Sequence, residues 1–117
     1  MYDAKPVVMQ ILSAIPGVTV SDAYPSDWSR LPHISFYEGA NSDHLKTGSR
    51  ALSDISIQID IWCRGSTGGL AAQVDEQMNS IGFRRQFTAD VPDPSGIKHK
   101  TMRYRGIVDA RTSLVHQ

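Results

Sequence analysis

The chain has 117 residues, of which 40% are hydrophobic and 21% are charged; this length suits one hydrophobic core, and the composition is that of a globular domain. These values argue against a disordered chain and a membrane-spanning one, so we expect no membrane association. Twelve Lys and Arg balance twelve Asp and Glu, so no net charge attracts DNA or anionic lipid, and any basic patch must be local.

The first elements predicted along the chain are a helix and a strand. Apolar residues spaced i, i+3, i+4 and i+7 indicate an amphipathic helix over about residues 3–15: Val8, Ile11, Leu12 and Ile15. Pro16 and Gly17 end this helix, and the β-branched run 18–20 favours a short strand. Turn-forming side chains then predict an irregular connection over 21–31.

A second strand and a long loop are predicted next. Ile34 and Phe36 alternate with polar neighbours, which is typical of a strand buried on one face. The following segment has two glycines, both charge signs and Leu45 as its only large apolar residue, so we predict an exposed hairpin loop at about 39–50. A loop of this length is usually disordered or used for binding, and we expect it to order in an assembly. Its candidate partner contacts are Asn41, Asp43, His44, Lys46 and Arg50.

The strongest strand signal in the chain is a run of alternating isoleucines. They place four apolar side chains on one face and mark the centre of the sheet: Ile55, Ile57, Ile59 and Ile61. A glycine-rich turn at 65–69 precedes a helix predicted over about 67–81, for which Gly82 offers a left-handed end.

The C-terminal part predicts a hairpin and a tail. Strands are expected at about 83–89 and 99–109, joined by a turn at 92–96, and a flexible tail at about 112–117. The order of elements favours a single α+β domain over residues 1–117, with a mixed or mostly antiparallel β-sheet and two α-helices packed on one face.

No motif of the sequence predicts a catalytic, cofactor-binding or metal-binding residue. Cys63 follows a central strand, where a buried, unreactive thiol is commoner than a nucleophile; as the single cysteine it forms no internal disulfide, which fits synthesis in a cytoplasm. The glycines at 65–69 lack the flanking residues of a phosphate-binding loop. The histidines lie far apart without metal-ligand spacing: His33, His44, His99 and His116.

Basic side chains concentrate in the C-terminal third, where pairing of the two last strands could bring them onto one surface: Arg84, Arg85, Lys98, Lys100, Arg103 and Arg105. A solvated sheet face, docking on an acidic protein surface and contact with the nucleic-acid backbone remain open. We take four of them as candidate partner contacts: Arg84, Arg85, Arg103 and Arg105.

The order of several segments resembles the tail-completion, or tail-terminator, proteins of siphophages and related prophages. Three segments carry the resemblance in the first half of the chain: Ala14-Ile15-Pro16-Gly17-Val18, Leu31-Pro32-His33-Ile34-Ser35-Phe36 and Gln58-Ile59-Asp60-Ile61-Trp62. Two further segments, 80–85 and 99–106, resemble prophage members of this group. The resemblance covers nearly the whole chain, and its motifs are structural rather than chemical.

The resemblance implies a virion protein made in the host cytoplasm, without catalytic activity. It implies a ring, a hexamer, that caps the head-proximal end of the tail tube, ends tube polymerisation and joins the head connector. The implied partners are further copies of the chain, the tail tube protein and a head-connector or neck protein, with DNA passing through the lumen without sequence-specific binding.

Two alternatives remain open. One is a head-completion or neck protein that seals the connector. The other is a small DNA-binding protein that uses the basic C-terminal hairpin, which predicts salt-dependent DNA binding by the isolated chain.

Overall fold

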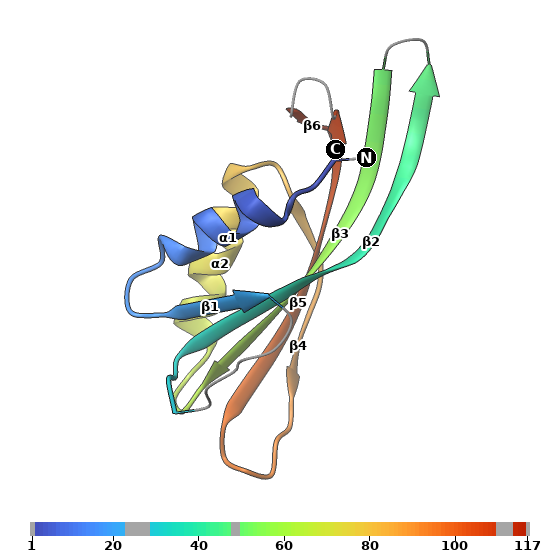
Figure 1. The fold of residues 1–117 in the computed structure, drawn as a ribbon. Helices are drawn as coiled ribbons and strands as arrows, with labels where there is room; N and C mark the ends of the chain where they lie inside the picture. The colour runs from blue at the N-terminus through green and yellow to red at the C-terminus, as the bar shows by residue number, and fades with distance from the viewer. Residues whose placement is uncertain (1, 23–28, 48–49, 110–113, 117) are drawn as a thin grey trace.

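The computed structural model describes residues 2–22, 29–47, 50–109 and 114–116, with side chains except at 43–47, 50–51 and 114–116. Two helices lie on the same side of a strongly twisted sheet (Figure 1), which confirms the predicted α+β class and mixed sheet. The elements are α1 (Lys5–Ser13), β1 (Thr19–Asp22), β2 (His33–Thr47), β3 (Arg50–Cys63), α2 (Gly68–Ser80), β4 (Arg84–Val91), β5 (Lys98–Asp109) and β6 (Leu114–His116).

The sheet has the strand order β1-β2-β3-β5-β4, with β6 paired to β5. β1 runs parallel to β2, and the remaining neighbours are antiparallel. β3 therefore lies in the middle, as the alternating isoleucines predict. β4 pairs with β5 as far as Arg105, and β6 takes up the same edge of β5 from Ile107 onward.

The core lies between the sheet and the two helices. The four alternating isoleucines of β3 are fully buried and point toward the helices, because side chains two residues apart on a strand share a face. They meet apolar side chains that the helical spacing of α1 and α2 turns inward: Val8, Leu12, Val74 and Met78. From β5, Met102 and Tyr104 complete this cluster.

α2 is fixed at its end and in its middle. Gly82 has a φ of +88°, and the N–H of Phe83 donates to the carbonyl of Met78 at 3.0 Å; this left-handed helix end is the one predicted from the sequence. One turn earlier, the buried Tyr104 donates its hydroxyl to Asp75 Oδ1 at 2.8 Å. Burial, and then the hydrogen bond to Asp75, raises the pKa of Tyr104 far above its usual range, so the phenol stays neutral and ties α2 to β5.

The predicted loop at about 39–50 is wrong for its described residues. They lie in β2 and β3, which pair as far as Thr47 and Arg50, and this hairpin extends beyond the helix layer (Figure 1). The register shifts between Glu38 and Ala40 and again between Asp43 and Leu45. These bulges interrupt the alternation that identifies a strand, while the backbone hydrogen bonds of an antiparallel pair need no apolar side chain.

The predicted flexible tail at about 112–117 is also corrected in part. Residues 114–116 form β6, which pairs with Ile107, Val108 and Asp109 of β5. This edge of β5 is left open where β4 begins, and backbone donors and acceptors are satisfied there by another strand. The rest of the predicted tail lies outside the described residues. No helix of the described chain is long and apolar enough to cross a membrane.

Candidate interaction surfaces

The six basic residues of the C-terminal hairpin lie on both faces of the sheet rather than on one. On β5, Met102 and Tyr104 point toward the helices, so alternation assigns the residues between them to the opposite face, which we call the outer face. Cross-strand pairing and a bulge between Arg85 and Phe87 set the faces on β4. The helix side has Arg85, Lys98 and Lys100. The outer face has Arg84, Arg103 and Arg105.

Three of these six cations are paired with carboxylates. The Arg85 and Lys100 side chains lie 3.7 Å from Asp75 and 3.0 Å from Asp90. Arg105 makes two hydrogen bonds to Asp54, at 2.8 and 2.6 Å, and this pairing raises the pKa of the guanidinium. The hairpin is therefore less basic toward a partner than its sequence suggests.

The outer face has an exposed patch of aromatic and basic side chains. Tyr37, Gln58, Arg103 and Phe87 form one row across four strands, and Arg103 lies 5.7 Å from the centre of the Phe87 ring. Tyr37 is 43% exposed, Phe87 47% and, on the same face, Val91 38%; these are the exposed large hydrophobic residues among those described. We call Tyr37, Phe87, Val91 and Arg103 the outer-face patch. Tyr and Arg are enriched at the energetic centres of protein interfaces.

A network of polar and aromatic side chains holds the outer face beside this patch. Trp62 stacks on His99 with ring centres 3.6 Å apart, and its indole N–H donates to Ser35 Oγ at 3.0 Å. His99 Nε2 lies 2.8 Å from Asp60 Oδ1. Trp62 and Ser35 are both buried, so this part of the face is rigid before any partner binds, which lowers the entropic cost of association.

His33 joins the edge strand β1 to the rest of the sheet. Its two ring nitrogens bond the hydroxyls of Thr19 and Ser21, the latter at 2.8 Å from Nε2. Burial, and then the charge of Arg30, lowers the pKa of His33, so the imidazole is neutral at neutral pH. The sequence alone did not predict these hydrogen bonds of His33, because the two hydroxyl groups belong to another strand, β1.

The candidate contacts predicted around the 39–50 segment lie along the projecting β2–β3 hairpin. Asn41 faces inward: its side-chain amide donates to the carbonyl of Tyr2 at 2.8 Å, and Tyr2 N–H donates to Ser53 Oγ at 3.2 Å. Asn41 therefore fastens the N-terminal segment to the hairpin. The other four lie on the paired strands, with side chains outside the described part: Asp43, His44, Lys46 and Arg50.

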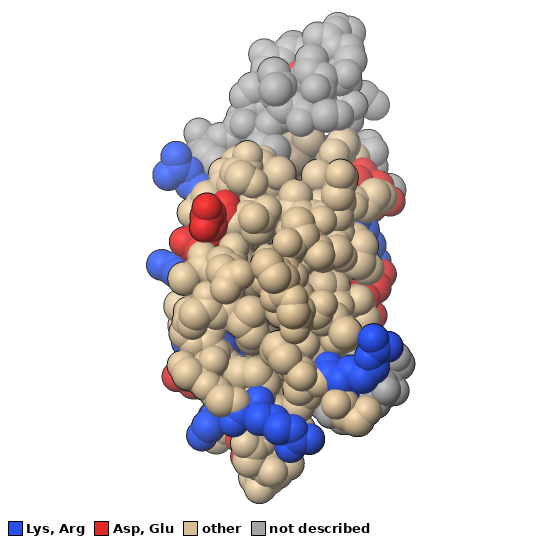
Figure 2. Space-filling model, turned by 90° about the vertical axis from the view of Figure 1, so that its left-hand side faces the viewer, with Lys and Arg blue, Asp and Glu red and all other residues tan. Residues whose placement is uncertain are grey.

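The helix-bearing side offers a second, different surface. Figure 2 shows its centre free of charged side chains, with both basic and acidic side chains at the margins. Cys63 is buried, as predicted, and its thiol donates to the carbonyl of Gly65 at 3.2 Å. Within the described residues, His, Cys, Asp and Glu do not gather in a group that could hold a metal ion.

No protein-family model matches the chain, and no curated protein matches its sequence.

Proposed function

We propose that the chain is a structural subunit of a bacteriophage virion, which caps the head-proximal end of the tail tube as a ring. In this role it ends tube polymerisation and forms the joining surface to the head connector. Its partners are further copies of itself, a hexamer in the implied ring, together with the tail tube protein and a head-connector or neck protein. DNA passes through the lumen without sequence-specific binding.

The observation that supports this role best is the outer-face patch. By the register of the strands, its three hydrophobic side chains, Tyr37, Phe87 and Val91, lie on the sheet face opposite the helices, and all three are exposed. Water contact with such side chains is unfavourable, and exposed aromatic side chains beside an Arg are typical of a protein-binding surface. The resemblance in the order of segments along the chain supports the same role.

The geometry also suits a ring. A closed ring of identical subunits is built from two different, complementary surfaces on each subunit. The chain offers two unlike sheet edges, since β1 is a short parallel strand and β4 a longer antiparallel one. The hairpin of β2 and β3 projects beyond the body and suits contact with a partner above or below the ring.

The alternative of a DNA-binding protein has less support. Such a protein needs several unpaired cations on one surface to bind the phosphate backbone. Here the six basic residues of the hairpin are divided between two faces, and three of them are paired with carboxylates. The head-completion alternative uses the same kind of surface and is separated from the tail role only by experiment.

Electron microscopy of particles made without this chain tests the proposal. A phage or prophage lacking the gene is induced, and tail length and head attachment are scored with and without the chain supplied in trans. We expect overlong or unattached tails that the supplied chain corrects. Normal joined virions would refute the virion role, and normal-length tails beside unsealed heads would establish the head-completion alternative instead.

A further inference from the structure

The two outermost strands of the sheet, β1 and β4, run in opposite directions. β1 is parallel to β2, and each later step across the sheet, to β3, β5 and β4, reverses the direction. Among the described residues, no strand pairs with the outer edge of either β1 or β4. A rotation about an axis along the strands preserves strand directions, so in a closed ring β4 of one copy lies antiparallel to β1 of the next.

Four rows of paired residues cross the sheet from one edge to the other. The first row begins at Thr19 and ends at Val91, and the fourth begins at Asp22 and ends at Thr88. The bulge of β4 lies before Phe87, so all four rows end in a regular stretch of this strand. A rotation moves no residue along its axis, and the rows therefore continue level into the next copy. The four residues of β1 then meet an equal length of β4.

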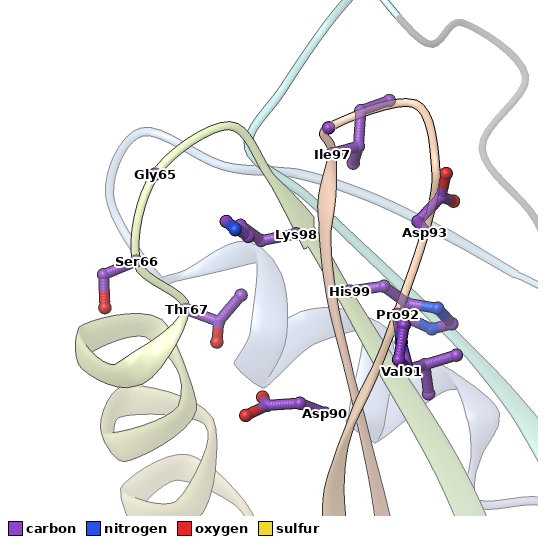
Figure 3. A pocket seen from close by; sticks show the side chains of 11 residues that line it. Gly65, Ser66, Thr67, Asp90, Val91, Pro92, Asp93, Ile97, Lys98 and His99 are labelled. Atoms are coloured by element: carbon purple, nitrogen blue, oxygen red, sulfur yellow. The ribbon is translucent and has the colours of Figure 1, made fainter.

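The side chains at the two edges fit such a joint. Val91 is exposed on the outer face at the margin of the sheet, and Thr19 of the next copy lies opposite it and covers part of its apolar surface. In Figure 3, Asp90 points to the other side of β4, toward α2. Its charge is balanced by Lys100 at 3.0 Å, so no unpaired carboxylate faces Val20 of the next copy.

Charged side chains on the helix side alternate in sign across the joint. Within one copy, the half-exposed Arg85 lies 3.7 Å from Asp75, and the half-exposed Asp22 lies 3.1 Å from Lys5. In the joined sheet Asp22 stands opposite Thr88, one row away from Arg85, and a diagonal neighbour is within reach of a long side chain. Asp75 and Arg85 of one copy are then followed by Asp22 and Lys5 of the next.

We propose that β4 of one copy pairs antiparallel with β1 of the next, so that the sheets of neighbouring subunits join into one continuous sheet. Residues 88–91 pair with residues 19–22 of the next copy, and Arg85 reaches Asp22 on the helix side. The pairing satisfies backbone donors and acceptors of both edges, and addition of a strand to an open sheet edge is an established mode of protein recognition. The inference rests on the proposed ring, because a cyclic arrangement gives each of the two edges its partner.

A cysteine on each edge tests this joint. Ser21→Cys combined with Ala89→Cys places two thiols at opposite ends of one row, on the outer face. Within one copy these ends are four strand spacings apart, about 19 Å, whereas a disulfide requires α-carbons within about 7 Å. Oxidation therefore links the thiols only between copies. We expect a ladder of linked chains on a denaturing gel, both from the concentrated purified chain and from assembled particles.

Single variants and the parent chain are the controls. Ser21→Cys alone, Ala89→Cys alone and the parent with its buried Cys63 should give no ladder. Asp22→Cys with Thr88→Cys repeats the test one row away. Both of these residues are exposed, so this second pair keeps the fold even if Ser21→Cys does not.

A charge exchange tests the contact between Arg85 and Asp22. In the Ser21→Cys, Ala89→Cys chain, Arg85→Asp should slow linking about fivefold, because one attractive pair becomes repulsive. Adding Asp22→Arg to the same chain should restore most of the rate, since the two charges are then exchanged. Slow linking in the combined variant would show that these two side chains do not meet.

Two outcomes would overturn the joint itself. A ladder no stronger than that of the parent, with both cysteine pairs and in both samples, would show that the edges do not meet. Linked dimers from Ala89→Cys alone would show that β4 pairs with β4 of another copy. The result is separate from that of the proposed function: the purified chain can link while virions without it are normal, and tails can depend on a chain whose edges never link.

Discussion

At the scale of single residues, Gly106 of β5 lies close to the ring of Phe83, which stands between α2 and β4. A β-carbon built on Gly106 would lie 3.0 Å from three ring carbons of Phe83. Phe83 is 1% exposed and belongs to the core cluster, so its ring has little room to move. The absence of a side chain at position 106 therefore determines how closely the end of α2 packs on the sheet.

Gly106→Ala should destabilise the protein by about 1–3 kcal/mol, the usual cost of overpacking a core. Gly65→Ala is the matched control, because a β-carbon there meets nothing within 4 Å. Urea denaturation of both variants measures the free energy of unfolding. If Gly106→Ala is as stable as the parent, the Phe83 ring is free to shift and the packing argument fails.

His33 predicts a loss of stability in mild acid. Burial and the charge of Arg30 lower its pKa in the folded protein, so the folded state favours the neutral ring more than the unfolded chain does. The stability linked to this preference is present above the unfolded pKa of about 6.5 and is lost as the pH falls through the lower folded value.

An NMR titration of the His33 ring proton checks the direction. We expect its midpoint to lie below that of histidine in an unfolded peptide, and Arg30→Gln to raise the midpoint by removing a nearby positive charge. A midpoint above the peptide value would show that the folded protein stabilises the charged ring instead.

At the scale of elements, the sequence predicts the helices and strands whose buried side chains recur at a regular spacing. The isoleucine alternation of β3 and the helical spacing in α1 and α2 arise because one side of each element is buried in a single core. In the β2–β3 hairpin, register shifts after Glu38 and after Asp43 break the alternation, and the pairing of the strands rests on backbone groups that every residue has. β6 cannot be predicted from the sequence pattern either. It pairs with the part of the β5 edge that β4 does not cover, and that part is defined only by the folded sheet.

The projecting hairpin should be removable without loss of the fold. Replacing residues 46–51 by Asn-Gly, a favourable two-residue turn, keeps Leu45 opposite Leu52 and leaves the buried isoleucines of β3 in place. We expect the free energy of unfolding by urea to change by less than about 1 kcal/mol, and assembly of joined virions to fail if the hairpin contacts a partner. In a control variant of the full-length chain, replacing only residues 48–49 by Asn-Gly keeps the paired strands and should leave assembly normal. Normal virions from the shortened chain would remove the hairpin from the interface.

At the scale of the whole molecule, the chain is 52 Å long and 23 Å across, with unlike surfaces on its two sides. The sequence identified the basic residues of the C-terminal hairpin but not their arrangement. Which face each one takes depends on the bulge after Arg85, and whether it is free depends on carboxylates from other elements, such as Asp54 and Asp75. Tyr37 entered the outer-face patch only through the cross-strand register, which single-sequence patterns do not contain.

Arg103 belongs to the outer-face patch, so its substitution tests the proposed role of this surface. It is exposed, lies between Gln58 and Phe87 in the row across the outer face, and has its guanidinium carbon 5.7 Å from the centre of the Phe87 ring. Arg103→Glu reverses a surface charge, so we expect the free energy of unfolding to change by no more than about 0.5 kcal/mol. At a protein interface the same change leaves a desolvated charge facing the wrong partner group, which costs several kcal/mol of binding. The yield of joined particles should therefore fall, as counted by electron microscopy.

Arg64→Glu, an exposed charge reversal off the patch, controls for net charge and should give a normal yield. If both variants assemble normally, the patch is not a contact surface; if both fail, the net charge of the subunit, rather than this patch, governs assembly.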